Sequence, residues 1–211
     1  MDEIKRISNI DFNTIVSNHN FSRNLMLKDY YLTAILYILK NVEGIYFKGG
    51  TALNKIFLDH PRLSEDIDFT LTRSEKDARD EILILLRELD FFKSYKEGKN
   101  ADGFLRMIIT CHSELGENEL FIDLNKRSKL ALPPEVHKVN HFYSPFIPEF
   151  SIKTLAKEEM IAEKVAATIG RNKPRDHFDV YQIIHADIPI NIEMVRKKCS
   201  DSNDEFSIIK M

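Results

Sequence analysis

Two aspartates with one residue between them are the side chains in this sequence best suited to chemistry. Asp66 and Asp68 lie in the run DIDFTL (66–71), where polar and apolar residues alternate as in a half-buried strand. Side chains two apart on a strand share a face, so both carboxylates would project together while Ile67 and Phe69 enter a core. Adjacent carboxylates repel each other unless a cation lies between them, and Mg²⁺ prefers oxygen ligands. The spacing therefore indicates a site for a hard divalent cation.

A third carboxylate for the same site comes from the run ELFIDLN (119–125). Apolar residues alternate along it, which leaves Asp123 on the opposite face. If the two strands are neighbours, Asp123 joins Asp66 and Asp68, and three carboxylates can hold two metal ions for in-line phosphoryl or nucleotidyl displacement. Alone, an Asp-x-Asp pair is more often an exposed strand edge or a turn, so the prediction depends on the residues around it.

A glycine bend upstream of the aspartates adds a possible phosphate site. The run IYFK (45–48) predicts a short buried strand, Gly49 and Gly50 follow, and TALNKIFL (51–58) predicts a helix with Thr51 near its N-cap. Backbone N–H groups at a helix start bind phosphate oxygens, and glycine lets the backbone approach a ligand closely. The alternative is a tight strand-to-helix turn. Neither GxxxxGK[ST] nor GxGxxG is present, which excludes a Walker A loop and a dinucleotide fingerprint.

Five further polar residues have both a functional and a structural interpretation. Arg62 could grip phosphates with its guanidinium or lie on the surface after a proline turn, and Ser64 could position a phosphate oxygen or close a turn. Lys164 lies opposite the main apolar face of its helix, on a side that is itself partly apolar, which favours a lining over open solvent. Asp176 and Asp179 fall in the first turns of the next helix, where acidic residues also complement the helix dipole.

The expected elements place these residues in an α+β fold with an α/β core. Strands are expected at 45–48, 66–71, 104–110 and 119–125, and helices at 21–41, 51–58, 75–90, 153–169, 175–186 and 190–199. Residues 131–150 hold four prolines and predict a connector. Mixed strands and helices thus come first and helices alone follow, which predicts a core domain at 1–130 and a helical C-terminal domain at 131–211.

Composition and charge narrow the class of protein. The 211 residues are 43% hydrophobic and 30% charged, enough for a buried core. The net charge of −3 excludes a strongly basic nucleic-acid coat protein, although residues 126–175 hold ten Lys or Arg against five Glu and could form a basic groove for RNA. Cys111 and Cys199 form no CxxC pair, which excludes a cysteine-ligated zinc site. No apolar run suits a membrane span or a signal peptide, so a cytoplasmic location is expected.

Three motifs, in this order, resemble those of the AbiEii/AbiGii-type nucleotidyltransferase toxins, relatives of the MenT toxins. They are GGTALNK, RLSEDIDF and EKVAATIGRNKPRDHFDVYQI, and they lie within residues 45–186. The resemblance implies a polymerase-β-like nucleotidyltransferase fold, a small mixed sheet flanked by helices with a helical C-terminal part. It also implies Mg²⁺-dependent transfer of a nucleotide from a nucleoside triphosphate, with two ions expected. For some relatives the acceptor is the 3′ end of tRNA, and a cognate antitoxin is encoded alongside.

The resemblance also assigns roles to residues at matching positions. The matches are Gly50 and Thr51 for phosphate binding, Asp66 and Asp68 for metal binding, Lys164 for the nucleotide phosphates, and Asp176 and Asp179 as the acidic pair of the last motif. The expected catalytic set is therefore Asp66, Asp68, Asp123 and Lys164, of which the three aspartates would bind metal. The expected nucleotide-binding set is Gly49, Gly50, Thr51, Arg62, Ser64, Lys164, Asp176 and Asp179.

Two alternatives from other classes stay open. A catalytically silent relative could bind nucleotide or RNA as a regulatory module, although the intact Asp-x-Asp pair makes this less favoured. A different metal-dependent phosphotransferase could use the same carboxylates to move the γ-phosphate. Labelled nucleotides separate these possibilities, because only nucleotidyl transfer carries the α-phosphate to the acceptor.

Overall fold

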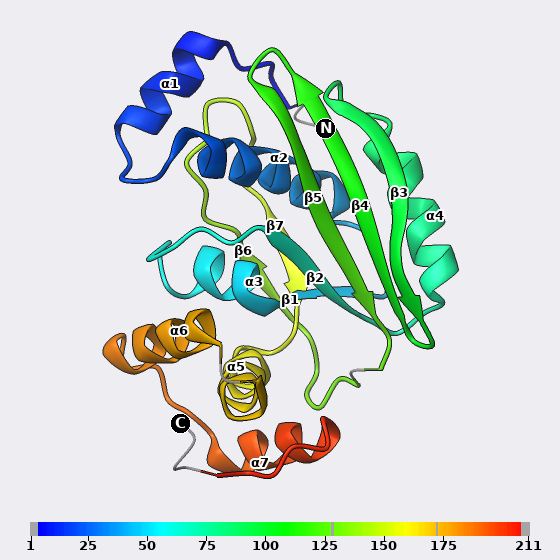
Figure 1. Cartoon of the computed structure of the whole chain (residues 1–211), viewed down its shortest axis with the longest axis vertical. Coiled ribbons are helices and arrows are strands. Elements are labelled where there is room, and N and C mark those ends of the chain that lie inside the picture. Colours follow the sequence, from blue (N-terminus) through cyan, green and yellow to red (C-terminus); the bar gives the residue numbers. More distant parts are fainter. Residues whose placement is uncertain (1–3, 128, 172, 208–211) are drawn as a thin grey trace.

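One mixed sheet forms the centre of the part of the chain that the computed structural model describes, residues 4–127, 129–171 and 173–207 (Figure 1). Its strand order is β3-β4-β5-β2-β1-β7-β6. The strands are β1 (Ile45–Lys48), β2 (Asp66–Leu71), β3 (Phe92–Ala101), β4 (Phe104–Ser113), β5 (Gly116–Asn125), β6 (Glu135–Lys138) and β7 (Ser151–Thr154). β2 pairs in parallel with β5 and antiparallel with β1, so the strand that carries the Asp-x-Asp pair lies in the middle of the sheet.

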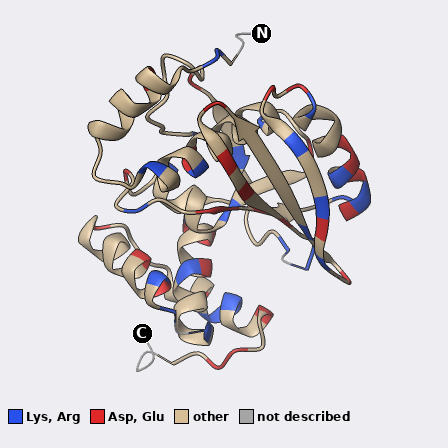
Figure 2. Cartoon of the chain, turned by 45° about the horizontal axis from the view of Figure 1, so that its top comes forward, with Lys and Arg blue, Asp and Glu red and all other residues tan. Residues whose placement is uncertain are grey.

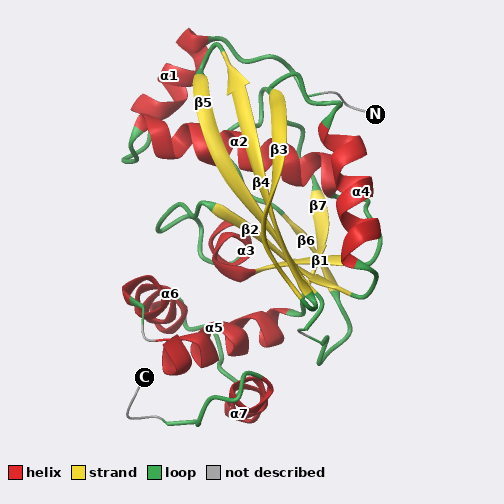
Figure 3. Cartoon of the chain, turned by 45° about the vertical axis from the view of Figure 1, so that its right-hand side comes forward, coloured by secondary structure: helices red, strands yellow, loops and turns green. Residues whose placement is uncertain are grey.

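Helices lie on the sheet and beyond one end of it. They are α1 (Asn9–Ser17), α2 (Arg23–Leu39), α3 (Gly49–Ile56), α4 (Glu75–Leu86), α5 (Lys157–Arg171), α6 (Pro174–His185) and α7 (Ile192–Asp201). α2 and α4 contact each other and β5, whereas α5, α6 and α7 gather at one end of the molecule (Figure 3). The mixed sheet flanked by helices confirms the predicted fold class. No helix among the described residues is long and apolar enough to cross a membrane.

Alternation of apolar residues explains the central strands. Ile67 and Phe69 of β2 are completely buried on the core side, as are Ile122 and Leu124 of β5. The polar residues between them project from the other face of the sheet. This confirms the two faces that the sequence predicts for each strand and leaves the aspartates on the side away from this core.

Three further strands lie where the sequence predicts no strand. β3 is a polar edge strand with the sequence FKSYKEGKNA, whose lysines protect an edge from pairing with another sheet but hide the strand signal. β6 and β7 have four residues each and pair antiparallel with each other. β6 lies within the expected connector, and β7 overlaps the start of the expected helix 153–169. That helix prediction is wrong at its start, because β7 pairs with β1 and α5 begins only at Lys157.

The helix after the glycine bend also begins earlier than predicted. α3 starts at Gly49, with Lys48 as its N-cap, so Thr51 is the third residue of the helix and not its cap. The last residue of the strand thus passes directly into the first turn of the helix. No side chain caps that turn, which leaves its first backbone N–H groups without an intrahelical partner.

Apolar packing forms a large core and a smaller one. The large core joins the sheet to α2, α3 and α4 and reaches the start of α5. The smaller core joins α5, α6 and α7, and its buried members are Ala162, Val165, Ala166, Ile169, Val180, Val195 and Cys199. The C-terminal helices therefore have a centre of their own. The division at residues 130 and 131 stays a prediction, and β6 and β7 beyond it belong to the common sheet.

A buried ion pair anchors α3, and with it the glycine bend, to α2. Lys55 Nζ lies 2.8 Å from Asp29 Oδ1, and both side chains are almost completely buried. Lys55 also donates to the Thr33 hydroxyl, while the Tyr143 hydroxyl donates to the second oxygen of Asp29. Since a buried charge without a partner is costly, this pair restricts where α3 can lie.

Replacing Lys55 should destabilise the protein strongly. In Lys55→Met the Asp29 carboxylate stays buried without its cation, so the free energy of unfolding should fall by about 3–5 kcal/mol in urea denaturation. Lys28→Met is the matched control, because Lys28 pairs with the mostly exposed Glu65 at 2.6 Å. In this control the free energy of unfolding should fall by less than about 1 kcal/mol. Equal losses in the two variants would contradict an anchoring role for Lys55.

Candidate active site

The register of the sheet brings three carboxylates together. β2 and β5 are neighbours, as predicted, and Asp68 lies opposite Asp123 in their parallel pairing. On the other side of β2, Asp68 lies opposite Lys48, the last residue of β1. Asp66 shares the face of Asp68 one pleat away. The site therefore consists of two aspartates on one strand, a third on the next strand and a lysine across from them.

Burial, together with the smaller effect of repulsion between these carboxylates, changes how readily they ionise. Burial raises the pKa of Asp68 to about 6, and the nearby charges of Asp123 and Asp66 add to this effect against the opposing cations Lys48 and Lys164. Burial also raises the pKa of Asp66. Such crowding favours a cation between the carboxylates, since a positive charge would offset both the desolvation and the repulsion.

Arg106 of β4 already supplies one positive charge to this group. Its guanidinium donates two hydrogen bonds to Asp123, at 2.7 and 2.6 Å, and lies over the ring of Phe121. Sequence analysis missed Arg106, although its strand alternates so that Leu105 and Met107 enter the core and Arg106 takes the face of the aspartates. What the strand pattern does not show is that β4 and β5 place Arg106 opposite Asp123.

The donor set fits Mg²⁺ at Asp66 and Asp68. Both are carboxylates with raised pKa values on one face of one strand, in a cavity, and oxygen is the ligand atom that Mg²⁺ prefers. Both oxygens of Asp123 are bound by Arg106, and among the described residues no three His, Cys, Asp or Glu side chains are arranged to hold a metal ion.

The glycine bend presses directly against the carboxylates. Gly49 has a φ of +79°, and a Cβ at this position would clash with the carboxylate of Asp68. Glycine is therefore required both by the backbone conformation and by the approach of Asp68. Gly50 lies between Arg62 and Ser64, where a Cβ would be 3.0 Å from a guanidinium nitrogen of Arg62. Both glycines and Ser64 line the cavity.

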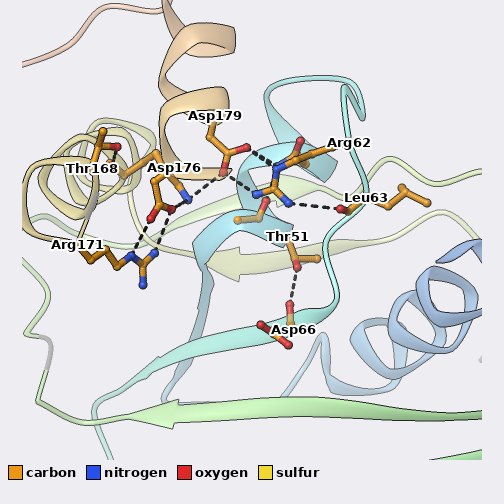
Figure 4. A network of polar contacts seen from close by, with 11 residues as sticks. Thr51, Arg62, Leu63, Asp66, Thr168, Arg171, Asp176 and Asp179 are labelled. Carbon is orange, nitrogen blue, oxygen red and sulfur yellow. Dashed lines mark hydrogen bonds and ion pairs between the residues drawn. The ribbon is translucent and has the colours of Figure 1, made fainter. Parts of the chain in front are cut away.

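Thr51 has a structural role at this bend. Its hydroxyl donates to the backbone carbonyl of Asp66, and its side chain is almost completely buried (Figure 4). It does not line the cavity. Because the hydroxyl ties α3 to β2, it is committed to the protein, and phosphate oxygens would meet the backbone at the start of α3.

Lys164 joins the two aspartates of the last motif. Its Nζ lies 3.0 Å from Asp176 and 2.9 Å from Asp179, and all three side chains are buried. Arg62 donates two hydrogen bonds to Asp179 at 2.7 and 2.6 Å, and Arg171 donates two to Asp176 (Figure 4). Burial alone would raise the pKa of each aspartate, but these cations hold both pKa values below the ordinary range.

This cluster changes the interpretation of the acidic pair. Asp176 and Asp179 do not line the cavity, whereas the cations they hold, Lys164, Arg62 and Arg171, do. The structure thus places the aspartates behind the cations. The guanidinium of Arg62 already binds Asp179 through two hydrogen bonds. To bind phosphates in the expected bidentate way, Arg62 would have to leave Asp179.

A cavity of about 330 Å³ connects the three carboxylates, the glycine bend and the cations around them. Its lining consists of Lys48, Gly49, Gly50, Arg62, Ser64, Asp66, Asp68, Phe104, Arg106, Asp123, Asn125, Met160, Glu163, Lys164, Ala167, Arg171 and Arg175. Six of these side chains are cationic and four are carboxylates, a combination suited to a metal ion together with a polyphosphate. Four charged cavity residues were not predicted as site residues from the sequence, although each lies within a motif or next to one: Lys48, Glu163, Arg171 and Arg175.

Neutralising Asp68 should stabilise the metal-free protein. The folded pKa of about 6 lies above the ordinary value of 3.8, so ionised Asp68 costs stability above pH 6 and the cost disappears as the pH falls towards 4. Asp68→Asn should therefore unfold at higher denaturant concentration in EDTA at pH 8, by at most about 3 kcal/mol, with no gain near pH 4. The exposed Asp102→Asn should show no such pH-dependent gain. A loss of stability at pH 8 would contradict the inferred repulsion.

Removing the charge of Asp179 should have the opposite effect. Asp179→Asn leaves Lys164 and Arg62 with less compensation at a buried position, so the free energy of unfolding should fall by about 3 kcal/mol. Nucleotide binding should weaken as well, because the cations lose their fixed positions. Denaturation and calorimetric titration with a nucleoside triphosphate measure the two effects. The exposed Asp187→Asn serves as a control on the same helical hairpin, and an equally small effect in both variants would exclude a positioning role.

Comparison with known proteins is consistent with this geometry. A crystal structure of JHP933 from Helicobacter pylori has a TM-score of 0.65 and 18% identity, covering 87% of this chain and 81% of that one. A crystal structure of a "putative nucleotidyltransferase" from H. pylori has a TM-score of 0.62 and 19% identity, covering 87% and 83%. At such identities these likenesses show the fold alone. No curated protein matches the chain by sequence.

The family assignment comes from the sequence. The family model described as nucleotidyl transferase AbiEii toxin, type IV toxin–antitoxin system, matches residues 32–211 and so covers most of the chain. The match includes the carboxylates, the glycine bend and the Lys164 cluster. It confirms the resemblance that the motifs indicate. The chain therefore belongs to the AbiEii family of toxin nucleotidyltransferases, and it is a nucleotidyltransferase.

Proposed function

We propose that the protein transfers a nucleotide from a nucleoside triphosphate to the 3′ end of an RNA, with tRNA as the expected acceptor. The observation that carries the proposal is the single cavity in which Asp66, Asp68 and Asp123 face the glycine bend and the cations of α5 and α6. The family adds that the protein is the toxin of a type IV toxin–antitoxin pair, so an antitoxin is its expected partner. We expect it to act in the cytoplasm, where both RNA and nucleotides are present.

Asp66 and Asp68 would hold Mg²⁺, and Asp123 would complete the site for two ions after release from Arg106. Bound Mg²⁺ offsets the charge of the phosphates and favours ionisation of the attacking hydroxyl. The proposal receives support from the raised pKa values of Asp66 and Asp68, which reflect first the burial of these carboxylates and then the nearby charge of Asp123. Arg106, once free of Asp123, remains within the cavity as a cation for the phosphates.

The remaining cavity residues would bind and orient the triphosphate. Backbone N–H groups at the start of α3 suit phosphate oxygens, and Lys164 offers a positive charge that Asp176 and Asp179 hold in place. The acceptor hydroxyl then attacks the α-phosphorus, a new phosphodiester bond forms, and pyrophosphate leaves from the opposite side. Preorganised cations stabilise the negative charge that develops on the departing group.

The RNA acceptor is favoured by the charge of the cavity rim. Arg171 and Arg175 line the cavity on the side of the C-terminal helices, and both are exposed to solvent. They belong to the segment 126–175, which has a net charge of +5 from ten basic and five acidic residues. A basic rim next to a catalytic cavity suits an acceptor with a phosphate backbone.

Nucleotides labelled at different phosphates test the reaction. The protein is incubated with total RNA, Mg²⁺ and each nucleoside triphosphate labelled at the α- or the γ-phosphate. We expect RNA to gain the α-label and never the γ-label, and Asp66→Asn to reduce transfer at least about hundred-fold. Glu65→Gln is the matched control, because this neighbouring carboxylate is exposed and pairs with Lys28. It should transfer normally.

Other outcomes distinguish the alternatives. Transfer of the γ-label would make the protein a phosphotransferase. Nucleotide and RNA binding without any transfer would make it a regulatory module. Expression of the wild type should also arrest growth when the antitoxin is absent, whereas Asp66→Asn should not.

A further inference from the structure

The outer face of α6 exposes aromatic and apolar side chains. Phe178 is 37% exposed, Tyr181 61% and Ile184 56%. The rings of Tyr181 and His185 stack with their centroids 5.9 Å apart and their planes within 4° of parallel. Large apolar side chains exposed together on one helix are uncommon in a protein that has no partner for them. This face therefore needs a functional explanation.

Charge is distributed unevenly around the same helix. Its two acidic residues, Asp176 and Asp179, are completely buried and neutralised by the Lys164 cluster. Figure 2 shows charged residues only in part of α6, and the two acidic ones are the buried aspartates, so the exposed residues of this helix include no acidic side chain. The exposed charges next to the aromatic face are Lys173, the N-cap residue, and Arg175 in the first turn, and both are positive. The surface suits an aromatic, negatively charged ligand.

The aromatic face begins about one helical turn after a residue of the catalytic cavity. Arg175 lines the cavity, and no hydrogen bond or ion pair joins its guanidinium to another side chain among the described residues. Phe178 follows Arg175 by three residues and Tyr181 by six, so they lie on neighbouring turns. The axial distance from Arg175 to Tyr181 is about 9 Å, which is the rise of roughly two to three stacked nucleotides. A strand whose end enters the cavity would pass over these rings.

We propose that Phe178, Tyr181 and His185 form a stacking platform for the single-stranded 3′ end of the acceptor RNA. Lys173 and Arg175 contact the phosphates of the same nucleotides and direct the terminal hydroxyl into the cavity. Proteins commonly bind unpaired nucleotides by stacking the bases on aromatic side chains while nearby cations contact the phosphates. The inference rests on the proposed function, and it assigns the acceptor to one surface of the molecule.

Replacing Tyr181 tests the platform directly. The probe is a fluorescein-labelled single-stranded RNA of twelve nucleotides with a free 3′ hydroxyl, and its Kd is measured by fluorescence anisotropy with the full chain. Loss of one stacked base should raise this Kd roughly 5- to 150-fold in Tyr181→Ala. Tyr181→Phe keeps the ring and should bind like the wild type. The Kd for nucleoside triphosphate should not change in either variant.

Two further variants give the controls. Ile84→Ala removes an equally exposed apolar side chain on α4, a helix that contributes no residue to the cavity lining, and should leave RNA binding unchanged. The double variant Lys173→Gln/Arg175→Gln should reduce the slope of log Kd against log salt concentration by about 1.4, because each phosphate contact on a single strand contributes about 0.7. Denaturation curves for all variants verify that each is folded.

The outcomes separate this inference from the proposed function. If the wild type labels RNA but Tyr181→Ala binds the probe within two-fold of the wild type, the platform is refuted and the proposed function stands. If the wild type labels no RNA under any condition, the proposed function fails, and the inference falls with it. If Tyr181→Ala keeps RNA binding but escapes inhibition by a co-expressed antitoxin, α6 is a protein-binding surface and the inference is overturned.

Discussion

The burial of like charges side by side is the constraint on which the rest of this structure depends. Asp66, Asp68 and Asp123 occupy adjacent strands, and burial weakens the screening that water would provide. The protein offsets part of this cost with Arg106, which binds Asp123, and with Lys48 at the end of β1. The pKa values of Asp66 and Asp68 remain raised despite these cations, chiefly because the two carboxylates are buried, so a cation bound between them would lower the cost of their charge.

A second layer of charges controls the cations that face the substrate. Lys164 is held between Asp176 and Asp179, which are completely buried and also bind arginines at the cavity. Breaking such a cluster is costly, because removing any member leaves another charge buried without compensation. In this chain the aspartates of the last motif therefore act by position, because they hold in place cations that line the cavity. The same burial leaves the outside of α6 free of acidic side chains and open to a polyanion.

The sequence was sufficient for the central features of the fold and for the faces on which the three aspartates lie. Alternation along 66–71 and 119–125 correctly predicted which side chains enter the core and which project together, because a strand repeats every two residues whatever its surroundings. The paired glycines correctly located the change from strand to helix, although the helix begins at Gly49. The motif order indicated the family, which the family model confirms. The polar edge strand β3 was not predicted, because its residues show little apolar alternation.

Tertiary structure alone decided which residues became partners. Nothing local to Arg106 shows that β4 lies beside β5 in a register that pairs it with Asp123. Similarly, the fork of Arg62 binds Asp179, 117 positions later in the chain, instead of pointing freely at a ligand. The placement of β7 beside β1 also depends on pairing between distant segments. Spacing along a chain specifies the face on which a side chain lies, whereas the identity of its partner depends on strand order, register and the burial of charge, and these are properties of the whole fold.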